Sequence, residues 1–178
     1  MSRRTALWIT GASMVALFVV LAVLDQRMSD TGGPGIIGFE LAGSVHRAHE
    51  ILADWGDKGH DAARLSLWLD YPYIVAYATF WTLAVAATRD LASRRRWSRM
   101  AAFGATIVAF PICAGILDSL ENVGLLLALG RHGGALAPLA ATVFASGKFL
   151  LSFSALAYVL AGLGLRAYRR LAPTTPRR

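Results

Sequence analysis

Residues 7–24 read LWITGASMVALFVVLAVL and carry no charged side chain. An α-helix needs about 20 apolar residues to cross a hydrocarbon core of ~30 Å, and this run is close to that length. Three further apolar runs cover about 65–88, 101–129 and 139–165. Together they predict an all-α integral membrane protein, a four-transmembrane-helix bundle that forms a single domain over residues 1–170.

The first run could instead be a secretory signal peptide, because Arg3 and Arg4 precede it. The apolar segment of a signal peptide is usually about 7–15 residues long, and a small-residue cleavage motif follows it. Here the run is longer and no such motif follows. We therefore expect a retained helix.

Basic residues predict the orientation of the chain. Arginines gather before the first run, in the 89–99 link and after the fourth run, and loops enriched in Arg and Lys are usually cytoplasmic. Both chain ends are thus predicted to be cytoplasmic, with residues 171–178 as a disordered tail. The net charge of +7 then reflects topology, and binding to nucleic acid is not expected.

Between the first two runs, residues about 39–55 are predicted to form an extracytoplasmic amphipathic helix. Its apolar positions recur at spacings of three and four: Leu41, Val45, Ala48, Leu52 and Trp55. Gly56 is expected to end this helix, and Asp61 to cap the next one. Such a helix would lie in the membrane interface or cover the bundle.

Charged side chains inside the apolar runs are the main candidates for function, because such groups are costly in a bilayer. Asp118, Glu121 and Asn122 share one helix face, on which Pro111 should kink the helix. Lys148 lies at a matching depth in the fourth run and should pair with one of the two acids. Alternatively, Lys148 and its partner form only a structural bridge.

Asp70 begins a second polar face, which Tyr73 and Tyr77 continue at spacings of three and seven. These residues are expected to line the entrance of a site, with Asp70 joining Asp118 and Glu121 as catalytic candidates. Asn122, Lys148 and the two tyrosines are expected to bind ligand. The structural alternative is that Asp70 caps a helix or pairs with Arg64.

Residues before the second run supply further candidates. His46, His49 and Glu50 share a helix face and could ligate a metal, but their spacing fits no established motif, so we assign no metal and expect His46 and Glu50 to contact ligand. Glu40 should either face a helix dipole or reach the charged cluster. The single cysteine, Cys113, excludes an intrachain disulfide and is expected to be a small packing residue.

Several short stretches carry a family resemblance: FELA at 39–42, ILADWG at 51–56, SLWLD at 66–70, LDSLEN at 117–122 and KF at 148–149. In these stretches the chain resembles a group of small bacterial four-helix membrane proteins that have no settled activity. The resemblance implies that six residues belong to one site: Glu40, Asp70, Asp118, Glu121, Asn122 and Lys148. We expect the protein to lie in a bacterial cytoplasmic membrane.

Three functions are compatible with these features. A pocket open to the outer leaflet could bind a membrane lipid or isoprenoid-like amphiphile, and could transform it by acid–base chemistry at Asp118 or Glu121 without a cofactor. The charged cluster could belong to a proton-coupled transporter, which would need a homo-oligomer to complete a pathway. The cluster could also serve only to hold the helices together in a structural or accessory membrane protein.

Overall fold

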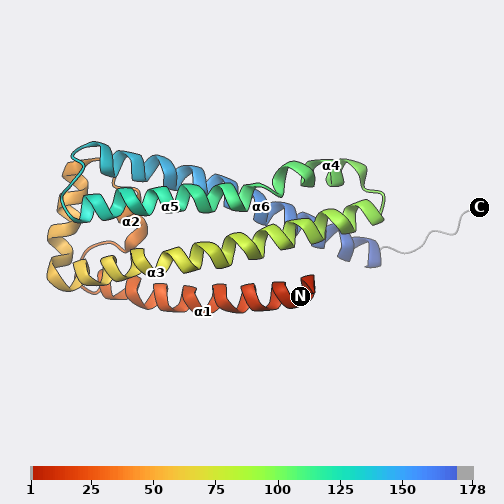
Figure 1. Cartoon of the computed structure of the whole chain (residues 1–178), viewed down its shortest axis with the longest axis horizontal. Helices are drawn as coiled ribbons and strands as arrows, with labels where there is room; N and C mark the ends of the chain where they lie inside the picture. Colours follow the sequence, from red (N-terminus) through yellow and green to blue (C-terminus); the bar gives the residue numbers. More distant parts are fainter. Residues whose placement is uncertain (1, 172–178) are drawn as a thin grey trace, which may run out of the picture.

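The protein, described over residues 2–171 by a computed structural model, is built of helices, and this part of the chain has no β-strand. The elements in chain order are α1 (Arg3–Ser29), α2 (Ile36–Glu40), α3 (Val45–Arg94), α4 (Ser98–Ile107), α5 (Phe110–Leu129) and α6 (Leu136–Leu171). The long helices lie side by side, and α2 lies at the end of the bundle opposite the start of α1 (Figure 1). Leu171, the first residue of the predicted tail at 171–178, ends α6, and the rest of that tail lies outside the described residues.

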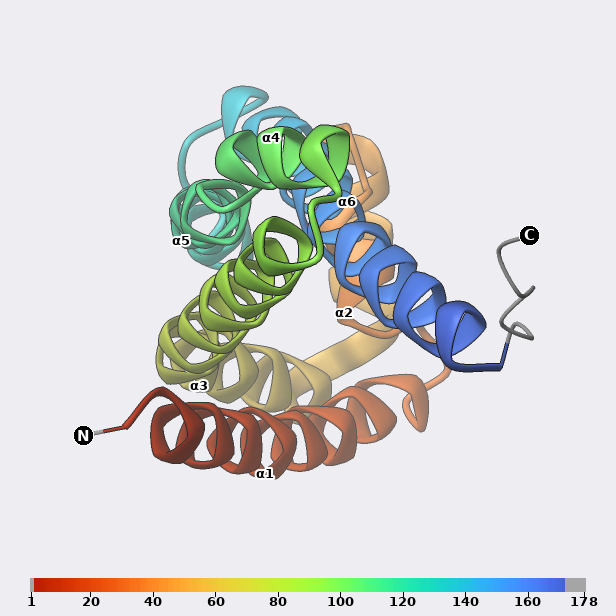
Figure 2. The ribbon, with the colours of Figure 1, turned by 90° about the vertical axis from the view of Figure 1, so that its right-hand side faces the viewer.

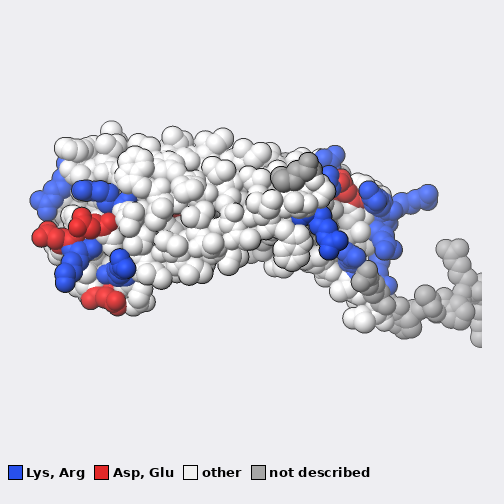
Figure 3. Space-filling view, turned by 60° about the horizontal axis from the view of Figure 1, so that its bottom comes forward, with Lys and Arg blue, Asp and Glu red and all other residues white. Residues whose placement is uncertain are grey.

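Three stretches are long and apolar enough to cross a membrane: Arg3–Ser29, Ser98–Leu129 and Leu136–Arg169. No other helix within residues 2–171 meets that standard, and α3, which contains the 65–88 run, carries Asp70 and Pro72 there. Charged side chains gather at both ends of the molecule, with an almost uncharged belt between them (Figure 3). This distribution is typical of a membrane protein.

α3 differs from the helices predicted for this region. The predicted amphipathic helix began near residue 39, but Leu41–Ser44 separate α2 from α3 and α3 begins at Val45. Leu41 is exposed, so it does not belong to the buried face. Asp61 lies inside α3 and caps nothing, because the chain is already helical again after Gly56.

The helical path breaks at Gly56, as predicted, although the chain continues as helix on both sides. Gly56 has φ +53°, a conformation that L residues with a side chain rarely adopt. Across this break, the His60 ring nitrogen Nε2 lies 3.1 Å from the Leu52 carbonyl oxygen. The His60 side chain thus joins the two helical parts of α3 on either side of Gly56.

A second break divides the predicted 101–129 helix into α4 and α5. Pro111 lies in the first turn of α5, where its missing N–H removes no helical hydrogen bond. The kink predicted at Pro111 appears as an interruption of the helix at Val108 and Ala109. Cys113, two residues after Pro111, is exposed, so the prediction of a packing role for it is wrong.

The packing of the bundle is uneven. α3 packs against α1, α5 and α6, and α5 packs along α6, but α1 and α6 are not packed against each other. The end-on view shows α1 and α6 along two edges of the bundle, with α3 and α5 completing it (Figure 2). The space between α1 and α6 contains the cavity described below.

Candidate functional site

Lys148 of α6 lies at the centre of the polar cluster. Its Nζ donates hydrogen bonds of 2.9 Å to Asp118 Oδ1 and 2.9 Å to Glu121 Oε1, both from α5. All three side chains are buried, and Glu121 is fully enclosed at 0% exposure. The expectation that Lys148 pairs with only one acid is therefore wrong. Asp118 and Glu121 lie about one helical turn apart on the same face of α5, so both carboxylates reach the Lys148 ammonium.

Glu40, the last residue of α2, adds a third carboxylate. Its Oε2 lies 3.4 Å from Lys148 Nζ, and that oxygen is buried with no hydrogen-bond partner. Of the two expectations for Glu40, reaching the cluster is the one seen. Burial raises the pKa of the Glu40 carboxyl above its ordinary value, while the Lys148 ammonium opposes that shift.

Two contacts hold α2, which is too short to be stable by itself, against the bundle. Asp25 of α1 accepts a hydrogen bond of 2.6 Å from the backbone N–H of Ile36, which lies in the first turn of α2. Thr142 of α6 donates to the Glu40 carbonyl at 2.7 Å and accepts from the Gly43 N–H at 3.0 Å. Glu40 is thus positioned by α1 and α6, the two helices that do not pack on each other.

Asp70 and the tyrosines of α3 extend the cluster along the bundle. Tyr77 donates its hydroxyl hydrogen to Asp118 Oδ2 at 2.9 Å, and Asn122 donates from Nδ2 to Asp70 Oδ2 at 2.7 Å. The rings of Tyr73 and Tyr77 are tilted against each other, with their centroids 5.3 Å apart. Asp70 therefore belongs to the interior network and does not pair with Arg64, so that structural alternative is excluded.

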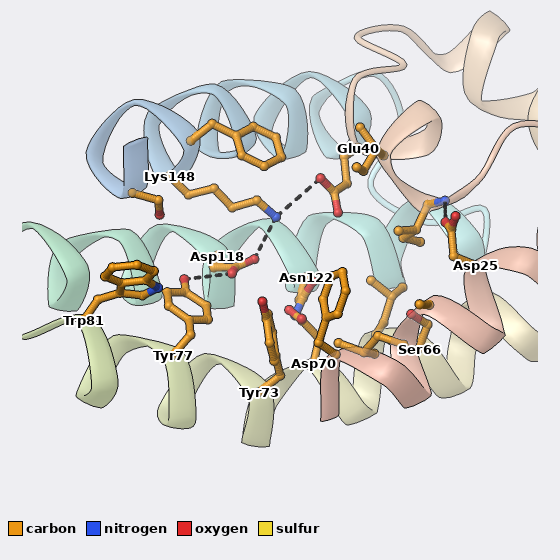
Figure 4. A pocket seen from close by; sticks show the side chains of 18 of the residues that line it. Asp25, Glu40, Ser66, Asp70, Tyr73, Tyr77, Trp81, Asp118, Asn122 and Lys148 are labelled. Atoms are coloured by element: carbon orange, nitrogen blue, oxygen red, sulfur yellow. Dashed lines mark hydrogen bonds and ion pairs between the residues drawn. The ribbon is translucent and has the colours of Figure 1, made fainter. Parts of the chain in front are cut away.

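A cavity of about 480 Å³ lies over this network, a size in the range of small-molecule sites. Its polar groups come from every helix except α4, and Figure 4 shows them pointing toward one space: Asp25, Glu40, Ser66, Asp70, Tyr73, Tyr77, Asp118, Asn122 and Lys148. Its apolar walls between α1 and α6 include Phe18, Leu21, Phe149, Phe153 and Leu156, and apolar side chains of α2 and α3 complete the lining. Phe18 and Phe153 are more than half exposed, so the cavity reaches the outer surface between these two helices.

Some predicted residues are not brought to this cavity. Glu121 lies behind Lys148 and does not line it, so it is placed to hold Lys148 and not to touch a ligand. His46 and Glu50 form an exposed pair at 3.1 Å on the first turns of α3, outside the cavity. A hydrogen bond from Arg47 lowers the pKa of Glu50. Within residues 2–171, no group of His, Cys, Asp or Glu is arranged to hold a metal.

Other cavity residues escaped prediction. Trp81 continues the Tyr73–Tyr77 spacing by four more residues and could have been found from it. Phe149, Ser152 and Phe153 follow Lys148 on its own helix, but two apolar rings and one small hydroxyl gave no reason to separate them from lipid-facing positions. Asp25 could not be recognised, because its role depends on the fold of the segment between α1 and α3.

The charged network and the cavity above it are the features from which function has to be inferred. Comparison with protein-family models, with curated proteins and with solved structures gives no match for this chain.

Proposed function

We propose that this protein is an integral membrane protein whose cavity binds an amphipathic lipid or isoprenoid-like ligand. In this proposal, the 65–88 part of α3 is a fourth membrane span. The arginine-rich end that contains the 89–99 link lies in the cytoplasm, and α2 lies on the opposite side. The distribution of Arg along the sequence supports this orientation.

The observation that carries the proposal is the division of one cavity into a polar floor and apolar walls. The floor contains hydrogen-bonding and ionisable groups, and the walls are formed by side chains of α1 and α6 that are part of the apolar belt. An amphiphile could place its headgroup on the floor and its hydrocarbon chain between the two helices. Buried polar groups would then find partners that hydrocarbon alone cannot supply.

Acid–base chemistry on the bound ligand is a further part of this proposal. Asp118 is already engaged by Lys148 and Tyr77, whereas Asp70 receives a hydrogen bond only from Asn122 and lines the cavity. Asp70 is therefore the better candidate for exchanging a proton with a ligand, and Tyr73 and Tyr77 could orient it. No step in this chemistry requires a cofactor.

Native mass spectrometry with lipid analysis tests the proposal directly. Protein purified in nanodiscs would be compared with Ser152→Phe, which places a ring in the cavity, and with Ser146→Phe, which adds the same ring on an exposed part of α6. We expect a lipid that co-purifies with the unmodified protein and with Ser146→Phe to be lost from Ser152→Phe. The same bulk lipid in all three samples would refute a specific ligand.

An accessory role is the second candidate, and the engagement of Lys148 by three acids favours it. The contacts join α2, α5 and α6 as a structural bridge would. Buried ion networks can often be replaced by apolar residues without loss of stability. If replacement of Asp118, Glu121 and Lys148 together by apolar residues left both the fold and the co-purified lipid unchanged, the cluster would be structural only.

A further inference from the structure

The floor of the cavity has more acidic than basic groups. Asp25, Glu40, Asp70 and Asp118 line it, and Lys148 is the only cationic side chain among its lining residues, which include no arginine or histidine. Charged groups interact strongly in a low-dielectric interior, so the charge of a ligand affects how tightly it binds there. A headgroup that brings positive charge would reduce the imbalance.

Lys148 is not available to an anionic headgroup. A lysine ammonium has three hydrogen-bond donors, and Lys148 Nζ already has carboxylate oxygens of Asp118, Glu121 and Glu40 at 2.9, 2.8 and 3.4 Å. An anion would have to displace one of these carboxylates and remain beside the others. Binding of an anionic headgroup at Lys148 is therefore not favoured.

Glu40 has the weakest contact with the ammonium among the three acids around Lys148. Its Oε2 lies 3.4 Å from Lys148 Nζ, against 2.9 Å for Asp118 and 2.8 Å for Glu121, and the residue as a whole is 8% exposed. Glu40 lines the cavity from α2 (Figure 4). Its carboxylate is therefore only partly neutralised by Lys148, and a cation in the cavity would neutralise it further.

Aromatic rings complete the surroundings of the floor. Tyr73, Tyr77, Trp81 and Phe149 line the cavity, and the ammonium of Lys148 lies 5.1 Å from the centroid of the Phe149 ring. Aromatic faces beside carboxylates are the usual environment for organic ammonium groups. The described residues offer no metal site, so an organic cation fits better than a metal ion.

We infer that the cavity selects amphiphiles with an amine or quaternary ammonium headgroup, held between Glu40, Asp70 and the aromatic rings, with the alkyl chain between α1 and α6. This inference rests on the proposed ligand-binding function and names its ligand class. It requires no covalent step.

A matched series of dodecyl compounds tests it: dodecyltrimethylammonium, dodecanol and dodecanoate, titrated below their micellar concentrations into protein in nanodiscs made of zwitterionic lipid. Binding is measured by native mass spectrometry, with empty nanodiscs giving the partition into lipid. We expect the cation to bind at least about tenfold tighter than the alcohol, a difference of ~1.4 kcal/mol that one desolvated cation–π contact can supply. Dodecanoate should bind most weakly.

Asp70→Asn should remove most of the preference for the cation while leaving dodecanol binding within about twofold, and Tyr73→Leu should weaken the cation in the same direction. Asp57→Asn makes the same change at an exposed site on α3 and should keep the preference. If the alcohol or the carboxylate bound as tightly as the cation, the headgroup inference would fail and the ligand pocket would stand. If no compound bound above the empty-nanodisc level, the proposed function itself would fail.

Discussion

Lys148 is the residue at which three helices meet inside the bundle. Replacing it with Met would leave Glu40, Asp118 and Glu121 buried close together without a counterion. We expect Lys148→Met to lower the free energy of unfolding by about 3–5 kcal/mol, the range for removal of one partner from a buried ion network. Thermal unfolding in detergent measures this.

Two variants make that experiment specific. Lys58→Met removes a lysine from an exposed part of α3 and should change stability by less than about 0.5 kcal/mol. Lys148→Met combined with Asp118→Leu and Glu121→Leu should recover part of the lost stability, because no buried charge from α5 then remains unpaired. A single Lys148→Met protein as stable as the unmodified one would contradict the central place given to this ammonium.

Glu40 should make the binding of a cation depend on pH. Burial raises the pKa of this carboxyl above the ordinary 4.5, so at pH values somewhat above 4.5 it still holds a proton that an exposed glutamate has lost. Raising the pH removes that proton and adds negative charge beside Lys148, Asp118 and Glu121. Dodecyltrimethylammonium should therefore bind more tightly as pH rises, and titrations at several pH values measure the change.

The matched variant for this prediction is Glu40→Gln, which keeps the shape of the side chain. It should bind the cation more weakly at the upper end of the pH range and should flatten the pH profile. An unchanged profile in Glu40→Gln would mean that another group titrates, and Asp70 would then be examined in the same way.

At the scale of single residues, the sequence predicted the polar cluster well. Asp118, Glu121, Asn122 and Lys148 were found because polar side chains stand out in apolar runs and helical spacing places them on common faces. The rotation of α5 about its axis was not predictable, and it decides that Asp118 lines the cavity whereas Glu121 is enclosed. The contact of Glu40 with Lys148 joins residues far apart in the chain, so the sequence could offer it only as one of two alternatives.

Among the elements, α2 brings Glu40 to the polar floor, and hydrogen bonds to Asp25 and Thr142 hold it there. Asp25→Ala removes the acceptor of the Ile36 N–H and should loosen α2 while the long helices keep their packing. Hydrogen exchange by mass spectrometry should then be faster in residues 31–44, with little change in α5. A Gln26→Ala variant alters an exposed contact of the same helix end and serves as the control; equal exchange in both variants would contradict the tethering role of Asp25.

Two interruptions of helices were predictable, but the continuity of α3 was not. Gly56 and Pro111 interrupt helices for reasons contained in their own chemistry, and both interruptions appear in the structure. The gap expected between Gly56 and Asp61 is instead helix. Its sequence has no strong turn signal, and packing of Gly59, Ala62 and Ala63 inside the bundle keeps it helical.

At the scale of the whole molecule, the four apolar runs predicted long helices, because the length of an apolar run can be read directly from the sequence. The arrangement of these helices was not predictable, since the same runs are compatible with any order of helices in a bundle. The lack of packing between α1 and α6 is the decisive feature of that arrangement, because it leaves an opening in the side of the bundle that leads to the cavity.

Cys113 lies exposed on α5, in the belt between the two charged ends. It is the single thiol of the chain, so the natural protein accepts one nitroxide spin label at one known position without any substitution. If the belt is immersed in a bilayer, molecular oxygen, which dissolves in hydrocarbon, should relax that label strongly, and a water-soluble nickel chelate should hardly affect it. The reverse result would mean that this face of α5 is in water, so the depth of the protein in its membrane can be measured from a residue already in place.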